Sequence, residues 1–226
     1  MKITFLGQAG LLFEKEDLTV MLDPYFSDSA AKEDESKHRR IPVDTSLLKI
    51  KPDVLIFTHD HTDHYDEKTA KRILPGSGGV TVLSPRSVWQ KARGFGGDNN
   101  YVVFDRGTEW TEGGVRFTAV KAVHSEPYAI GVIIEDLEDG RKYYITGDTL
   151  YSESIFCDIP RDIYALFLPI NGEGNNMNEL DAMRFAARVG ARFTVPFHVG
   201  LLDDKTDVCF VGENKVSPKI YEEIKL

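Results

Sequence analysis

A short apolar run, DVLIFT (Asp53–Thr58), leads directly into the polar segment HDHTDH (His59–His64). The run follows Pro52 and has the length of a buried strand, so the polar segment begins where that strand ends. Side chains that follow buried strands commonly contribute to open sites. The fold must therefore bury this strand in its core and leave the end of the strand accessible.

Four side chains of this segment are metal-ligand types at HxHxDH spacing. In an extended segment residues two apart point the same way, so His59 and His61 can converge on one ion. Asp63 and His64 break that alternation, which suits a second ion beside the first. A solvated polar loop and a closed structural zinc site are the alternatives. The first does not explain the spacing after a buried strand, and the second is typically rich in cysteine, which is absent nearby.

Three more residues of ligand type follow apolar strands far along the chain. His124 follows FTAVKAV, Asp148 follows YYITG, and His198 follows FTVPF. Each residue alone is typical of a cap or a surface position. Together with the first segment, however, they place five of the six histidines at strand ends, which favours one shared metal site.

Short strands and helical segments alternate along the rest of the chain. Strands are predicted at residues 2–7, 11–16, 18–25, 53–58, 80–85, 101–104, 115–123, 129–137, 141–148, 164–170 and 192–198. Helices are predicted at residues 67–74, 86–95, 178–190 and 217–226. The strands run in two blocks, each followed by helices, which indicates two sheets packed face to face with helices outside. We take residues 1–226 as a single domain.

Composition narrows the classes of partner. The chain is 42% hydrophobic and 28% charged, which suits a folded core, and its formal net charge of −9 argues against a broad nucleic-acid surface. No apolar run approaches the roughly 18 residues that span a bilayer. Cys157 and Cys209 are far apart, which favours a reducing compartment. We expect a cytoplasmic protein that acts on a small molecule, without nucleic-acid or membrane partners, and a homo-oligomer is compatible with the sequence.

In order along the chain, these motifs resemble the metallo-β-lactamase superfamily. The resemblance rests on HxHxDH at His59–His64, then His124, GDT at Gly147–Thr149 and His198. It runs from Lys2 to about Leu202 and implies an α/β fold, a four-layer αββα sandwich, in agreement with the two blocks of strands. Further motifs are similar to the branch that contains L-ascorbate-6-phosphate lactonase: MLDPYFSDS (Met21–Ser29), VHSEPYAIG (Val123–Gly131), GDTLY (Gly147–Tyr151) and LPINGEGNNMN (Leu168–Asn178).

The resemblance implies two divalent ions, zinc or manganese, with iron also open. It assigns His59, His61 and His124 to one ion and Asp63, His64 and His198 to the other, with Asp148 bridging them. It also implies that a hydroxide shared by the ions attacks the substrate and that Asp63 orients this nucleophile or accepts its proton. His61 and Asp63 are therefore the predicted catalytic residues.

The resulting expectation is a metal-dependent hydrolase of a small ester or lactone, including sugar-phosphate lactones. Phosphodiester hydrolysis, oxidation by a single iron as in a persulfide dioxygenase, and a non-catalytic binding protein are the alternatives. Substrate contacts are predicted from two loops. Arg39 and Arg40 in the polar segment 27–46 are suited to phosphate or carboxylate, and Asn171 and Asn176 are placed at a pocket rim. Both loops are also compatible with ordinary solvated turns.

Overall fold

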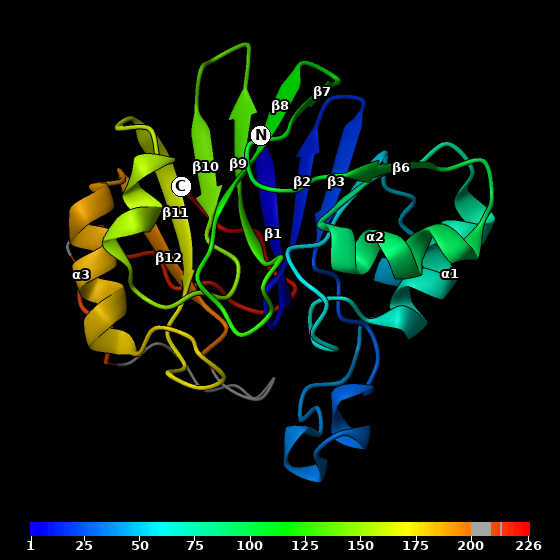
Figure 1. Ribbon diagram of the computed structural model, residues 1–226, viewed down its shortest axis with the longest axis horizontal. Helices are drawn as coiled ribbons and strands as arrows, with labels where there is room; N and C mark the ends of the chain where they lie inside the picture. The colour runs from blue at the N-terminus through cyan, green and yellow to red at the C-terminus, as the bar shows by residue number, and fades with distance from the viewer. Residues whose placement is uncertain (200–208, 213) are drawn as a thin grey trace.

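Two six-stranded sheets pack face to face in the computed structural model, which describes residues 1–199, 209–212 and 214–226 (Figure 1). The first sheet has its strands in chain order: β1 (Lys2–Gly7), β2 (Gly10–Lys15), β3 (Leu18–Leu22), β4 (Val54–Ile56), β5 (Thr81–Ser84) and β6 (Asn100–Val103). The second sheet has the spatial order β12-β11-β10-β9-β8-β7. Its strands are β7 (Glu109–Glu112), β8 (Val115–Lys121), β9 (Ile130–Asp136), β10 (Lys142–Ile145), β11 (Ile163–Pro169) and β12 (Phe193–Phe197).

Both sheets are mixed. In the first sheet β1, β2 and β3 pair antiparallel, and β3 to β6 pair parallel. In the second sheet β7 to β10 pair antiparallel, and β10, β11 and β12 pair parallel. The carboxyl ends of parallel strands meet at one edge of a sheet, so the loops after β4, β10 and β12 lie at the same end of the sandwich, at the bottom of Figure 1.

Helices cover the outer faces of both sheets. The helices α1 (Glu67–Ser77) and α2 (Arg86–Ala92) lie on the first sheet, and α3 (Glu179–Val189) lies on the second (Figure 1). The side chain of Asn178 caps α3 by accepting a hydrogen bond from the backbone N–H of Asp181, and Gly190 ends the helix in the left-handed region. The predicted four-layer αββα sandwich is therefore confirmed. None of the helices in the described part of the chain is long and apolar enough to cross a bilayer.

The largest apolar cluster lies between the two sheets. It combines inward-facing residues of both halves of the chain, including Phe13 of the first sheet and Tyr143 and Phe167 of the second. The ring of Phe13 packs edge-on against Tyr143 and Phe167, with centroid separations of 6.0 and 6.3 Å. Aromatic pairs in this geometry add about 0.5–1.5 kcal/mol beyond the burial of their area. This packing fixes one sheet against the other and hence positions the loops at their ends.

The predicted helix at residues 217–226 is wrong. This segment instead runs along β1, where the Ile224 N–H donates to the Ile3 carbonyl at 2.8 Å and the Phe5 N–H donates to the Glu222 carbonyl at 3.1 Å. β1 is an edge strand, so its backbone groups need partners. An isolated helix of this length is marginal in water, and coverage of the edge also buries Ile224 in the central core. Strand β7 was not predicted from the sequence. Helix α1 extends to Ser77, three residues beyond its predicted end at residue 74.

The C-terminal segment also holds the polar segment 27–46, which projects beyond the sheets at the bottom of Figure 1. The guanidinium of Arg39 donates to the Tyr221 hydroxyl at 3.0 Å and to the Tyr25 carbonyl at 2.7 Å. The Tyr221 hydroxyl in turn donates to the Pro42 carbonyl at 3.0 Å. Arg39 is only 8% exposed. It therefore forms an internal bracket that joins two distant parts of the chain.

Replacement of Tyr221 by Phe removes the hydroxyl from this bracket and leaves a buried guanidinium N–H without its partner. The expected loss is about 1 kcal/mol, which corresponds to a fall of about 2–4 °C in the melting temperature of a chain of this size. Tyr128→Phe is the matched control, because the Tyr128 side chain is 47% exposed. Equal melting temperatures for the two variants in differential scanning calorimetry would contradict the bracket.

Candidate metal centre

Four loops bring the seven predicted ligand side chains together. The loop after β4 supplies four of them, and the loops after β8, β10 and β12 supply one each. Their potential ligand atoms form three groups in which all atoms lie within 4.8 Å of one another: His59, His61 and His124; His59, His64 and Asp148; and Asp63, His64 and His198. The structure thus gathers all seven residues at one end of the sandwich.

The first group consists of imidazoles. The Nδ1 atom of His61 lies 3.0 Å from Nε2 of His59 and 3.1 Å from Nε2 of His124. The other nitrogen of His124, Nδ1, lies 3.2 Å from the carbonyl of Asn175, to which it is placed to donate. Burial lowers the pKa of His59 well below its ordinary value and also lowers the pKa of His124. Neutral imidazoles are the form that binds metal ions.

The other two groups, which share His64, combine carboxylates with imidazoles. Asp63 Oδ2 lies 3.2 Å from His198 Nε2 and 4.0 Å from His64 Nε2. Asp148 connects these groups to the first, because its Oδ1 lies 3.2 Å from His64 Nε2 and its Oδ2 lies 4.0 Å from His124 Nε2. Asp148 is therefore the side chain that connects the two halves of the centre.

The charged side chains of this centre strongly shift the pKa values of their neighbours. Burial by itself lowers the pKa of His64, but the Asp148 and Asp23 carboxylates raise it well above its ordinary value. The pKa of His198 is raised in the same way, against its burial, by Asp148 and Asp63. Burial raises the pKa of Asp148, yet His198 and His64 hold it well below its ordinary range. The negative potential that favours protons on these imidazoles equally favours a bound cation.

The donor set fits a divalent metal ion. His64 Nε2 and Asp148 Oδ1 are buried, and apart from their 3.2 Å contact with each other neither has a hydrogen-bond partner among the described residues. Among the described residues, no lysine or arginine forms an ion pair with Asp63 or Asp148. Buried carboxylates without a compensating charge are costly, and a mixed set of imidazoles and carboxylates suits zinc, manganese or iron. These side chains can therefore hold a metal ion in place of the missing basic residue.

Three amide side chains orient the ligands from outside. Gln8 Nε2 donates to Asp63 Oδ2 at 2.8 Å, and Asn176 Nδ2 donates to Asp148 Oδ2 at 2.8 Å. The amide nitrogen of Asn171 lies 3.0 Å from His198 Nδ1. That contact leaves Nε2 of the ring facing the carboxylates. Outer contacts of this kind fix the orientation of metal ligands.

The backbone around the centre adopts uncommon conformations. Gln8, Asp23 and His198 have φ values of 54°, 42° and 49°, in the left-handed region. Such residues cost about 1–3 kcal/mol each and cluster at functional sites. Gly147 has φ 60°, and a Cβ there would come within 2.6 Å of the Ile130 carbonyl. Only glycine fits immediately before Asp148, which accounts for the GDT sequence.

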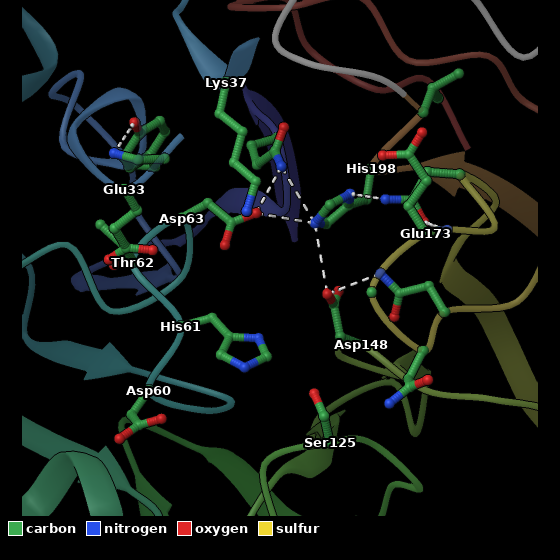
Figure 2. Close-up of a pocket in the computed structure, with 18 residues that line it drawn as sticks. Glu33, Lys37, Asp60, His61, Thr62, Asp63, Ser125, Asp148, Glu173 and His198 are labelled. Atoms are coloured by element: carbon green, nitrogen blue, oxygen red, sulfur yellow. Dashed lines mark hydrogen bonds and ion pairs between the residues drawn. The ribbon is translucent and has the colours of Figure 1, made fainter. Parts of the chain in front are cut away.

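A pocket of about 670 Å³ opens onto the centre and is lined by His61, Asp63, Asp148 and His198 (Figure 2). This volume is typical of sites for small molecules. Two loops form further parts of its lining. The polar segment 27–46 supplies Glu33 and Lys37, and the loop after β11 supplies Asn171, Glu173, Asn175 and Asn176.

The predicted substrate contacts divide into two outcomes. Asn171 and Asn176 line the pocket, as expected for a rim. Arg39 and Arg40 are not among the described residues that line it, so the structure offers no support for them as substrate contacts, which stay a prediction. The Arg39 guanidinium is occupied by the Tyr25 carbonyl and by the C-terminal bracket, and Arg40 is exposed.

Several residues at the site were not predicted from the sequence. Lys37 lies in the same polar segment as the two arginines, so composition did not distinguish them. Gln8 is a polar residue inside an apolar stretch, and this was a signal that it has a partner in the fold. Asp23 lies in the MLDPY motif, but its role emerges only from its contacts with Thr58 and His64.

The chain is similar to known families over most of its length. Residues 19–199 match the profile of the beta-lactamase superfamily domain. A UPF0173 metal-dependent hydrolase of Korarchaeum cryptofilum is 31% identical over 205 residues, covering 88% of this chain and 82% of the relative. Another from Geobacillus thermodenitrificans is 27% identical over 215 residues, covering 88% and 85%.

Two solved structures share the fold. A possible metal-dependent hydrolase from Veillonella parvula has a TM-score of 0.78 at 16% identity, covering 100% of this chain and 99% of that one. An isothiocyanate hydrolase from Delia radicum gut bacteria has a TM-score of 0.71 at 17% identity, with the same coverage of 100% and 99%. The fold, the match over residues 19–199 and the archaeal relative agree. The chain belongs to the metallo-β-lactamase superfamily and, within it, to the UPF0173 family of metal-dependent hydrolases.

Proposed function

We propose that this protein hydrolyses a small ester or lactone, sugar-phosphate lactones included, with two divalent metal ions. The observation that carries the proposal is the set of overlapping ligand groups, which lie at the floor of one pocket and are connected by Asp148. A single site for one ion would not need seven converging ligands. The similarity to the branch of L-ascorbate-6-phosphate lactonase is part of this proposal.

In this proposal the seven ligands are assigned to the two ions by the groups in which they lie. His59, His61 and His124 would hold one ion, Asp63, His64 and His198 the other, and Asp148 would contact both. Bound divalent ions lower the pKa of water toward about 7 and polarise a substrate oxygen. No serine or cysteine nucleophile is then required.

Asp63 is placed to align the attacking water. Its side chain is 27% exposed and lines the pocket. One of its oxygens, Oδ2, accepts a hydrogen bond from Gln8 and faces His198, which leaves the other oxygen for a further hydrogen bond. The carboxylate can therefore accept a hydrogen bond from water while Gln8 prevents its rotation. His61 also lines the pocket (Figure 2).

Asp23 orients the His64 ring through Nδ1, the nitrogen that does not face the other metal ligands. It is fully buried, it accepts hydrogen bonds from the backbone N–H and hydroxyl of Thr58 at 2.8 and 2.5 Å, and its Oδ2 lies 2.8 Å from His64 Nδ1. A proton held on Nδ1 by this carboxylate leaves Nε2 free as a ligand. Asp23 thereby links the first strand block to the histidine segment.

The pocket favours a small substrate over a polyanion. Its lining includes the carboxylates of Glu33, Asp60 and Glu173 in addition to those of the proposed ligands Asp63 and Asp148. These carboxylates repel an extended chain of phosphates, whereas a compact ester or lactone does not need to contact all of them. Phosphodiester hydrolysis uses the same ions and stays the alternative within this proposal.

A reducing, cytoplasmic setting remains part of the proposal. Cys157 and Cys209 are both exposed and unpaired. Exposed free thiols persist where the compartment keeps them reduced. Zinc and manganese are both available to such a protein and both suit its donor set.

Removal of metal is expected to lower thermal stability strongly. An ion present at about 1,000 times its Kd stabilises the folded state by about 4 kcal/mol, which is on the order of 10 °C in melting temperature for a chain of this size. The measurement is scanning calorimetry before and after EDTA, with elemental analysis of the same samples and refilling by zinc or manganese. If the melting temperature is unchanged after the metal has been removed, bound metal does not stabilise the folded state and the claim that it balances the carboxylates is refuted.

The substitution His61→Ala should lower kcat/KM more than about 100-fold, because even the loss of an outer contact to a ligand costs 10–100-fold. The assay compares lactones and 4-nitrophenyl esters with bis-4-nitrophenyl phosphate, which separates the proposed reaction from its alternative. His38→Ala is the matched control, since its ring is 69% exposed and does not line the pocket. Retained activity in the His61 variant would overturn the assignment.

The substitution Asp23→Asn should weaken metal binding by about 10–100-fold, as found for outer contacts to ligating histidines. Competition against a coloured chelator measures the affinity. Asp53→Asn is the control, because Asp53 also accepts a backbone hydrogen bond, from Thr19 at 2.7 Å, and is not among the ligands or the pocket lining. If the two variants bind metal equally well, Asp23 does not act through His64.

A further inference from the structure

The polar segment 27–46 forms one wall of the pocket. Ala30, Glu33 and Lys37 belong to it and line the cavity. Figure 2 shows the Lys37 side chain extending into the pocket toward Asp63, with Glu173 on the opposite side. The wall thus brings a lysine to the space above the metal ligands.

Hydrogen bonds at Glu33 and Arg39 tie this wall to the rest of the fold. The backbone N–H of Arg39 donates to the Asp28 carboxylate at 2.8 Å, and the Arg39 guanidinium is held by Tyr221 and by the Tyr25 carbonyl. Closer to the metal ligands, the Thr62 hydroxyl donates to the Glu33 carboxylate. Lys37 therefore extends from a backbone that is tied to the metal-binding loop and to the C-terminal segment.

The ammonium group of Lys37 forms no short ion pair within the described structure, although its charge acts at longer range on Asp34. Lys37 is the only lysine or arginine among the described residues that line the pocket, and it forms no ion pair within 4 Å with any described residue. By contrast, Asp60 on the same rim is paired with Lys91 at 2.8 Å. The ion pairs of the pocket carboxylates Asp63 and Asp148 are formed with imidazoles and not with Lys37. The lysine ammonium therefore points at the space that a substrate would fill.

We propose that Lys37 recognises a single anionic group, a carboxylate or a phosphate, on the substrate. The inference rests on the proposed hydrolase function and specifies its substrate class. A lysine ammonium binds such groups through charge-assisted hydrogen bonds. The neighbouring carboxylates Glu33 and Glu173 limit the substrate to one such group, because further negative charge would lie beside them.

The experiment uses the full, metal-loaded chain with two pairs of probes. One pair is 4-nitrophenyl acetate and the mono-4-nitrophenyl ester of glutaric acid, and the other is glucono-1,5-lactone and its 6-phosphate. Lys37→Gln should lower the ratio of kcat/KM between the anionic and the neutral member of a pair by about tenfold, through KM. Lys37→Arg should restore most of that ratio. Lys32→Gln, an exposed lysine of the same segment outside the lining, should leave the ratio as in the wild type.

Binding is measured in parallel, so that the inference does not depend on turnover of these probes. Isothermal titration of inorganic phosphate and of the monocarboxylate butyrate should give a Kd about tenfold weaker for Lys37→Gln than for wild type in at least one case, which identifies the group recognised. Equal ratios and equal Kd values in both proteins would overturn the role of Lys37. Wild-type protein that hydrolyses none of the four probes, yet loses anion binding in the variant, would count against the hydrolase function alone.

Discussion

Two carboxylates without a lysine or arginine partner, Asp148 buried and Asp63 partly buried, govern the structure at this end of the molecule. Asp63 and Asp148 meet only imidazoles and amides among the described residues. Within the described part of the polypeptide only protons on His64 and His198 can balance these carboxylates, and a divalent ion held by the neutral rings would replace those protons. The left-handed backbone at Gln8 and His198 is tolerated for the same reason, since it aims these side chains at the shared space.

The sandwich supplies the geometry that this constraint needs. The first sheet delivers the histidine segment after β4, and the second sheet delivers His124, Asp148 and His198 after β8, β10 and β12. The aromatic packing between the sheets holds these loops in register. Neither half of the chain contains a complete ligand set, so formation of the site depends on the docking of one sheet on the other.

The sequence was informative where chemistry is encoded locally. HxHxDH after an apolar strand, and single ligand types at three later strand ends, predicted the side chains that converge, and the two blocks of strands predicted the layers. Long-range contacts were not readable in this way. Arg39 and Lys37 are two residues apart in one charged loop, and contacts that include the distant Tyr221 distinguish the buried Arg39. The prediction of a terminal helix was wrong for a similar reason: the segment pairs with the edge of β1, which lies more than 200 residues away in sequence.

The most direct test of the two-ion centre is anomalous X-ray diffraction from crystals loaded with zinc or manganese, recorded on both sides of the metal edge. The account predicts two peaks of anomalous density. One would lie among His59, His61 and His124, the other among Asp63, His64 and His198, and the Asp148 carboxylate would contact both. A single peak, or none within these groups under saturating metal, would contradict it.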